Sequence, residues 1–428
     1  MAKTKKITIG KLLFLGLLLR LFLVIISRSH PDILNHLDWG IRFLSLGPQK
    51  FYENIFWNVS WPNQPLGSIL LFAFMAIIKN SLFSSIMFLN NTIAAFPSFI
   101  IPVLESNLHI WLVKLPFILS DLGLGFLIYK IVNQFQPKKA LLAASIFIFN
   151  PVLIYNSTIW GQTDSIINLL AIWGIYLIYQ KKYFPGIFIF LLGFTFKLSL
   201  IIYLPIVGLL FLKRIKDWKK IILPIVSFFV FLLIVAIPFK LNGFNSFQWI
   251  WYMYTNRVLP RQGSMLNGNA FNLWALLLSI DLSKSEFTPF LGLTYQFWGR
   301  LLYILFLIPL WFKFIKSKLT LKNLLTALMI TAFGCFIFLT NMHERYLYPI
   351  FPLISILIFI PKSKFNIKQL TLLSTIHFLN LYNLWFYPSI PILKNLLIWN
   401  NYFLCRCLSI ILILICFKYY IRYLKSED

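Results

Sequence analysis

The sequence predicts an all-α, polytopic bundle of transmembrane helices, and three observations support this prediction. The chain is 59% hydrophobic and 12% charged, with a mean hydropathy of +0.80, which is far outside the composition of soluble proteins. Many apolar runs approach the roughly 20 residues that a helix needs to cross a bilayer. These runs are continuous, whereas membrane-spanning strands would alternate apolar and polar residues. We therefore expect about 12–14 spans in a single integral-membrane domain, residues 1–428.

The net charge of +27 is distributed over short basic clusters between the apolar runs. The strongest cluster is KRIKDWKK, residues 213–220. Loops rich in Lys and Arg stay in the cytoplasm, so the pattern predicts a multi-pass protein with both termini cytoplasmic, in the plasma membrane. Most acidic residues fall in the alternate loops, on the outer side. The basic charge therefore indicates topology and contact with anionic lipids rather than nucleic-acid binding.

The first outer loop, residues 28–66, is the most unusual polar stretch. It follows a first span at about residues 11–27, which we expect to be uncleaved because no small-x-small site follows its apolar centre. The loop is rich in tryptophan and contains Asp32, Asp38 and Glu53. Its segment PDILNHLDWGIRFLSLG spaces apolar residues as in an amphipathic helix lying at the membrane surface.

Asp38 is the expected catalytic residue of this loop. A carboxylate held at the interface beside Trp39 can take a proton from an acceptor hydroxyl, and partial burial would raise its pKa into a useful range. The alternative for either aspartate is a solvated residue or a helix cap. That alternative suits Asp32, which follows Pro31, although Asp32 is kept as a candidate for substrate binding.

A second polar cluster, NSTIWGQTD, covers residues 156–164. Trp160 could approach a bound sugar ring, and Gln162 and Asp164 could bond its hydroxyls. The alternative is an ordinary helix cap, for which Thr163 or Asp164 would suffice.

A third cluster, NMHERY, covers residues 341–346 and places His343, Glu344 and Arg345 in succession. Arg is suited to bidentate contact with phosphate. The alternative is an exposed turn whose arginine reaches toward the head groups. The His-Glu pair lacks a second His at i+4 and is no zinc motif.

A fourth, polar-aromatic stretch on the outer side, residues 241–270, contains Arg257 and Arg261. An interfacial belt of aromatic residues explains part of this composition, but the two arginines could also receive an anionic head group. Lys197 stands alone between two apolar runs and is another candidate phosphate partner.

The sequence assigns no metal and no certain cofactor. All four cysteines lie in apolar stretches, which favours neither disulfides nor a zinc site. Asp32 and Asp38 are six residues apart, so a metal-binding acid pair is not evident, and dependence on a divalent metal is left open.

Taken in order, these motifs resemble the GT-C superfamily of membrane glycosyltransferases, which use sugars linked to polyprenyl or dolichyl phosphate. The resemblance is to mannosyltransferase-like members. It rests on Asp38 with FYE (51–53) and WPNQPLG (61–67), on KLPFILSDLGLGFLIYK (114–130), on NPVLIYNSTIWGQTD (150–164) and on MHERYLYP (342–349). Many relatives have two prolines where this chain has Asn63-Gln64-Pro65.

The resemblance implies a bundle of GT-C type whose first outer loop carries the general base, here Asp38. It also implies that the acid of WGQTD holds sugar and that Arg345 meets the lipid phosphate. The expected reaction is an inverting transfer of a sugar such as mannose from a polyprenyl-phosphate donor, on the extracytoplasmic face. The acceptor would be a glycan, lipid or protein. The alternative is a transporter or flippase of a lipid-linked or polyanionic substrate, although the duplicated halves common in such proteins are not visible here.

Overall fold

The computed structural model describes residues 8–239, 243–260 and 263–426. Within these ranges the protein is a helical bundle, with one short antiparallel pair formed by β1 (Pro289–Phe290) and β2 (Leu293–Thr294). The predicted all-α class is confirmed. The helices, in chain order, are α1 (Ile9–Ile26), α2 (Pro31–Phe51), α3 (Leu66–Thr92), η1 (Ser98–Ile100), α4 (Ile101–Asn133), α5 (Pro137–Ile148), α6 (Pro151–Ile154), η2 (Tyr155–Trp160), α7 (Asp164–Tyr179), α8 (Tyr183–Phe194), η3 (Leu198–Tyr203), α9 (Leu204–Arg214), α10 (Lys219–Ala236), η4 (Ile237–Phe239), α11 (Ser246–Met253), η5 (Tyr254–Val258), α12 (Leu273–Leu278), α13 (Tyr295–Lys316), α14 (Leu321–Phe338), η6 (Glu344–Leu347), α15 (Ile350–Leu357), α16 (Ile367–Leu384) and α17 (Pro391–Leu424).

Seven helices in the described ranges are long and apolar enough to cross a membrane, or eight if the bent pair 137–148 and 151–160 counts as one span. This number is smaller than the about 12–14 spans expected from apolar runs. The difference arises because several apolar runs form helices that are too short to cross alone. Examples are α7 with 16 residues, α8 with 12 and α15 with 8.

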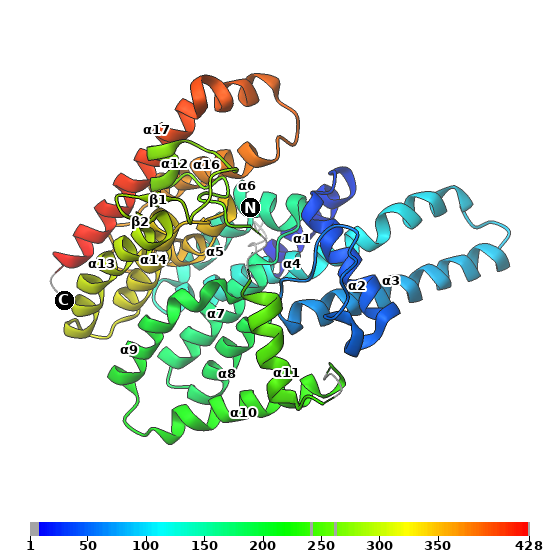
Figure 1. The fold of residues 1–428 in the computed structure, drawn as a ribbon, viewed down its shortest axis with the longest axis horizontal. Helices are drawn as coiled ribbons and strands as arrows, with labels where there is room; N and C mark the ends of the chain where they lie inside the picture. Colours follow the sequence, from blue (N-terminus) through cyan, green and yellow to red (C-terminus); the bar gives the residue numbers. More distant parts are fainter. Residues whose placement is uncertain (1–7, 240–242, 261–262, 427–428) are drawn as a thin grey trace, which may run out of the picture.

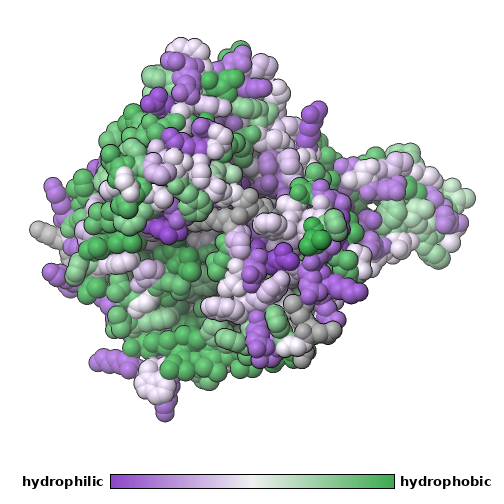
Figure 2. Space-filling model, in the orientation of Figure 1, coloured by the Kyte–Doolittle hydropathy of each residue, from purple (hydrophilic) through white to green (hydrophobic). Residues whose placement is uncertain are grey.

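The centre of the bundle is α14, whose residues are buried over 89% of its length. A helix that is apolar on every side is stable only when other helices surround it. In contrast, α10 is 22% buried and leaves large apolar side chains exposed, including Leu223, Phe229 and Ile234. Figure 2 shows continuous apolar surface over this side of the molecule and polar side chains concentrated around α2. Such a surface is typical of a protein that faces lipid.

The basic loops gather at one end of the bundle. The ammonium of Lys213, in the last turn of α9, donates to the carbonyl oxygens of Phe314 and Ile315 at 2.7 Å, and Lys313 donates to Ser426 O at 2.5 Å. The C-terminus therefore lies beside the two most basic loops. The helix α2 lies on the opposite side of the molecule (Figure 1).

The first outer loop forms the helix that its apolar spacing predicts. α2 buries Ile33 and Trp39 and exposes Leu34, Ile41 and Leu44. Gly47, at φ 74°, interrupts the helix in a left-handed conformation that glycine adopts without strain. After α2, the chain continues into a long hairpin of α3 and α4 that projects from the body (Figure 1). Every residue from 77 to 108 keeps part of its side chain exposed.

Candidate active site

Asp32 stands at the start of α2, where local sequence fixes its position. His30 is the N-cap and Pro31 occupies the first turn, where a missing N–H costs nothing. The backbone N–H of Asp32 donates to His30 Nδ1 at 3.0 Å. An acidic residue in the first turn is stabilised by the helix dipole. The Asp32 carboxylate therefore has a fixed position in the first turn of α2, and it faces the segment 156–164.

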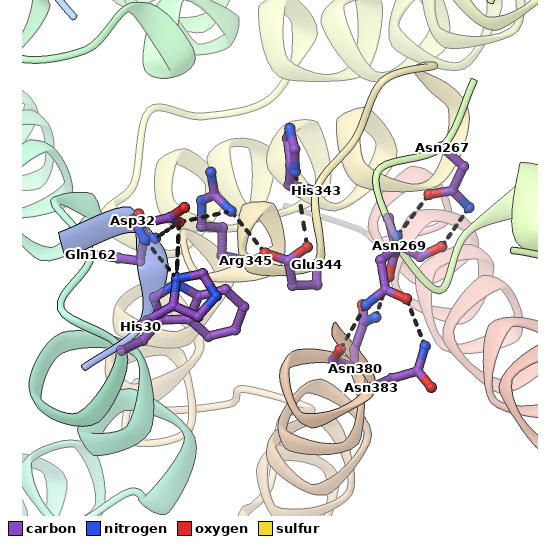
Figure 3. Close-up of polar contacts among 12 residues, drawn as sticks. His30, Asp32, Gln162, Asn267, Asn269, His343, Glu344, Arg345, Asn380 and Asn383 are labelled. Atoms are coloured by element: carbon purple, nitrogen blue, oxygen red, sulfur yellow. Dashed lines mark hydrogen bonds and ion pairs between the residues drawn. The ribbon is translucent and has the colours of Figure 1, made fainter. Parts of the chain in front are cut away.

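Two side chains of that segment donate to the same oxygen of Asp32. Trp160 Nε1 lies 3.2 Å from Asp32 Oδ2, and Gln162 Nε2 also bonds this oxygen (Figure 3). Trp160 is the last residue of the π-helix η2, and Gly161 ends that helix at φ 87°. A Cβ at Gly161 would come within 3.0 Å of Ile33 Cγ1, so the absence of a side chain allows α2 to approach η2 closely.

The third side of the site is the turn η6. Arg345 Nη1 lies 3.8 Å from Asp32 Oδ2 and donates to Glu344 Oε1 at 2.8 Å (Figure 3). His343 Nδ1 lies 3.9 Å from the other oxygen of Glu344. One guanidinium therefore bridges a carboxylate from the first outer loop and a buried carboxylate of its own turn.

A second ion pair lies beside the first. Lys197 Nζ donates to Asp164 Oδ1 at 2.9 Å. The Lys197 ammonium is 5.0 Å from the ring centre of Tyr346, and the Arg345 guanidinium is 5.6 Å from the same ring. Two cations thus lie near one aromatic ring, and each keeps a carboxylate partner.

The charges of these groups determine their protonation. Burial raises the pKa of Asp32, but Arg345 and His30 outweigh it, and the pKa falls to about 2. Burial raises the pKa of Glu344 to about 6, although Arg345 opposes the shift. Burial tends to lower the pKa of Arg345. The carboxylates of Glu344 and Asp32 outweigh this effect, and the pKa of Arg345 rises above its usual value. At neutral pH the site therefore contains ionised carboxylates and a permanent guanidinium charge.

Two histidines near Asp32 are neutral at physiological pH. Burial lowers the pKa of both His30 and His36 to about 4, and the nearby Arg345 contributes to each shift. His30 stacks on Trp160 at 4.1 Å between ring centres. His36 is 3% exposed and lies one helical turn after Asp32. Neither histidine was predicted as a site residue, although the i, i+4 spacing of Asp32 and His36 on an amphipathic helix is a usable signal.

Asp38 lies in different surroundings from those expected for it. Its Oδ1 accepts from Arg42 Nε at 2.9 Å and from Asn58 Nδ2 at 2.7 Å, and its Oδ2 accepts from the backbone N–H of Asn58 at 3.3 Å. The Asp38 side chain is 8% exposed, whereas that of Asp32 is 32% exposed. Asp38 thus connects α2 to the following loop, and it is Asp32 that meets Gln162 and Arg345. The catalytic role of Asp38 stays a prediction.

The second polar-aromatic stretch contributes support rather than direct contacts to this cluster. Among the described residues, Arg257 on η5 forms no ion pair with Asp32, and Arg261 lies outside those residues. The segment 267–272 is held by amides instead: Asn380 Nδ2 donates to Asn269 O at 2.5 Å. This segment lies against the third cluster, because Gly268 N donates to Met342 O at 2.9 Å.

The structure therefore brings together most of the candidate binding residues from four separate segments. These residues are Asp32, Trp160, Gln162, Asp164, Lys197, His343, Glu344 and Arg345. Their functions stay predictions. Among the described residues, no group of three or more His, Cys, Asp or Glu side chains is arranged to hold a metal ion.

Comparison with known proteins supports the resemblance to membrane mannosyltransferases. No family model matches the chain. The protein named GPI mannosyltransferase 1 from Kluyveromyces lactis is 27% identical over 196 residues, which are 42% of this chain and 47% of that protein. The protein of the same name from Saccharomyces cerevisiae is 24% identical over 181 residues, 40% of this chain and 43% of that protein. The chain thus matches less than half the length of either curated relative, and over that part it is similar to yeast GPI mannosyltransferases.

Proposed function

We propose that the chain is an integral-membrane glycosyltransferase that moves a sugar, mannose by analogy with its relatives, from a polyprenyl-phosphate donor to an acceptor hydroxyl. The observation that carries this proposal is the ion pair of the ionised carboxylate Asp32 with Arg345, whose guanidinium lies near the same tyrosine ring as the Lys197 ammonium. These charges gather at one end of a bundle of apolar helices. A transfer of this kind needs a base for the acceptor and positive charge for the departing phosphate.

In the proposed reaction, the acceptor oxygen attacks the anomeric carbon from the side opposite the phosphate. The bond between that carbon and the phosphate oxygen breaks, and its electron pair stays on the phosphate. Arg345 and Lys197 neutralise the added charge, and the acceptor proton moves to the Asp32 carboxylate. A single displacement with a single base inverts the configuration of the sugar. No metal is needed to balance this step. The base is assigned to Asp32 because its carboxylate is partly exposed and lies beside Arg345, whereas that of Asp38 is nearly buried against Arg42 and Asn58.

The low pKa of Asp32 fits a role that begins only when the donor is bound. In the structure, Arg345 contributes to keeping this pKa at about 2, which makes the carboxylate a weak base. A phosphate that engages Arg345 would draw the guanidinium away from Asp32. The basicity of Asp32 would then rise in the complex, where a base is required.

The extracytoplasmic face is proposed as the side of the reaction. The helix α14 begins beside the basic loop 313–318 and ends just before the turn that carries Arg345. Likewise, α8 begins after Lys181 and Lys182 and ends just before Lys197. The cluster therefore lies at the opposite helix ends from the basic loops, which supports an outer location under the positive-inside rule.

The decisive experiment compares Asp32→Asn with Asp38→Asn in purified protein, with radiolabelled polyprenyl-phosphate mannose as the donor. We expect Asp32→Asn to lower transfer by about 10²–10⁴-fold, the usual contribution of a general base. Asp38→Asn should keep most of the transfer activity of the folded protein. Full transfer by Asp32→Asn would overturn the base assignment. Movement of the labelled lipid across the membrane without any transfer would instead favour the transporter alternative.

A further inference from the structure

A buried carboxylate inside the membrane layer bonds to both segments that form the candidate active site. Asp121 lies on α4 and is completely buried. Its Oδ2 accepts from Arg20 Nη2 at 3.0 Å and from Ser157 Oγ at 2.7 Å. Its Oδ1 accepts from the hydroxyl of Tyr348. The mechanism proposed above does not use Asp121, which is too deeply buried to meet a substrate.

The partners of Asp121 belong to the elements that surround Asp32. Ser157 is part of η2, the π-helix that ends at Trp160 and is followed by Gln162. Tyr348 directly follows η6, the turn that contains Arg345. One carboxylate therefore bonds, through its two oxygens, to the two segments whose side chains converge on Asp32. The distance between these segments in the site depends on this shared anchor.

A second charged residue of α4 bonds to the C-terminal end of the π-helix η2. Lys114 lies seven residues, about two helical turns, before Asp121 and so on the same face of α4. Its ammonium, also completely buried, donates to Ile159 O at 2.8 Å, one residue before Trp160. A cation at the carbonyl end of a helix is favourable. α4 thus holds η2 near its middle through Asp121 and near its end through Lys114.

Stability alone does not explain why a charged group is kept at this depth. Moving ions into an apolar layer is costly, and well-packed apolar residues of similar volume often replace a buried ion pair without loss of stability. A charge network does, however, fix directions that apolar packing leaves free, because each hydrogen bond requires a particular geometry. The bonds to Ser157 and Tyr348 supply two such directions, one toward each segment.

We propose that Asp121 is a positioning residue of the transfer reaction, which holds Trp160 and Gln162 in register with Arg345 around Asp32. The proposal rests on the proposed function, in which Asp32 and Arg345 meet the substrates. Asp121 acts through Ser157 and Tyr348 and does not contact the reacting atoms. Its removal should therefore slow the reaction of bound substrates more than it weakens their binding, since a misplacement of about 1 Å can lower a rate by about 100-fold.

The test uses two mild substitutions, Ser157→Ala and Tyr348→Phe, with their double variant, alongside Asp121→Asn. The full-length protein is compared in transfer assays that separate kcat from KM. We expect each single variant to lower kcat by about 10-fold or more with KM within about twofold. Because both act on one anchor, the double variant should resemble Asp121→Asn rather than the product of the single effects. Ser409→Ala is the matched control, since the hydroxyl of this buried serine on α17 donates to Cys405 O at 2.9 Å, within its own helix, and bonds no other residue of the described ranges.

Two further readouts separate positioning from a general loss of structure. The acid limb of kcat/KM should move to higher pH, because the Trp160 hydrogen bond helps to lower the pKa of Asp32. Amide hydrogen exchange should increase in 155–165 and 343–349 but not in α14. Wild-type kcat in the double variant, or a loss of kcat with unchanged pH profile and unchanged exchange, would overturn the positioning role. If exchange increases as expected but Asp32→Asn transfers normally, the positioning of the segments stands and the proposed base is wrong.

Discussion

Arg345 lies between Asp32 and Glu344, with its Nη1 atom 3.8 Å from Asp32 Oδ2 and 2.8 Å from Glu344 Oε1. The first carboxylate belongs to α2 and is partly exposed, whereas the second is completely buried in the arginine's own turn. The unequal distances mean that Glu344 holds the guanidinium in place while Asp32 makes the looser contact. In the proposed reaction, the donor phosphate would replace Asp32 as a partner of Arg345 while the bond to Glu344 remains.

Arg345→Lys is expected to lower kcat/KM for transfer although the positive charge is kept. A lysine is a point charge and cannot bond Glu344 while it presents a planar pair of donors to a phosphate. The loss should be about 10- to 100-fold, because a hydrogen bond to a charged group contributes about 1.5–3 kcal/mol. Arg300→Lys, at an exposed position of α13, is the matched control and should transfer as the wild type does. Equal activity of both variants would contradict a phosphate contact by Arg345.

Asp38→Ala is expected to lower the melting temperature in detergent while leaving transfer by the folded fraction within about threefold of wild type. The substitution leaves Asn58 and Arg42 without their shared acceptor, which costs about 1–3 kcal/mol in a part-buried site. Asp217→Ala is the control, because this exposed aspartate makes a surface hydrogen bond with Lys219 N at 3.1 Å and a loose ion pair with Lys220 at 3.9 Å. A normal melting temperature with abolished transfer would restore Asp38 as the catalytic base.

Glu344→Gln is expected to change how thermal stability depends on pH. Because burial raises the pKa of Glu344 from 4.5 to about 6, the protonated form is favoured by the fold. The wild type is therefore most stabilised by this residue below pH 4.5 and loses about 2 kcal/mol as the pH rises to about 6. The Gln variant lacks this loss. Between pH 4.5 and 6, the melting temperature of the variant should therefore rise relative to that of the wild type. A constant difference across that window would show that Glu344 has an ordinary pKa.

Gly161→Ala is expected to reduce both stability and transfer. Its left-handed conformation costs a residue with a side chain about 1–2 kcal/mol, and the new Cβ would collide with Ile33 on α2. Because α2 would be displaced from Trp160, transfer should fall more than stability alone predicts. Adding Ile33→Val should recover part of the activity by removing the clashing methyl group. Gly208→Ala on α9, where a Cβ meets no atom within 4 Å, should be harmless.

The sequence predicted that the polar motifs converge, but not which face of α2 lies toward the other motifs. Polar segments at the ends of apolar helices meet on one side of a bundle, so Trp160, Gln162 and Arg345 could be grouped from their positions alone. Residues six apart in a helix point about 120° away from each other, so Asp32 and Asp38 could not both reach one centre. The choice between them depends on the rotation of α2, which is fixed by Gly40 against Phe72 and by Ile33 against Gly161. These are tertiary contacts that a periodic pattern does not reveal.

The number of membrane spans could not be predicted from the sequence either, for a different reason. Hydropathy marks the apolar runs, but it does not show whether a run crosses the bilayer or is buried within the protein. The helix α15 is completely buried among its neighbours, and the bend between α5 and α6 places a break inside one apolar run. The basic residue Lys79 lies inside the continuous helix α3 and not at its end. Contacts with other helices decide each of these cases.

The ion pair between Arg20 and Asp121 also has a consequence for how the protein is made. Its two residues are 101 positions apart, so the ribosome releases α1 long before α4 exists. During that interval the insertion machinery must accommodate an arginine in an otherwise apolar helix, at a cost of about 2.5–3.5 kcal/mol at the middle of the membrane. We expect α1 to stay near the translocation channel until α4 arrives to neutralise it. Stable insertion of the first helix into the membrane would then depend on the synthesis of α4.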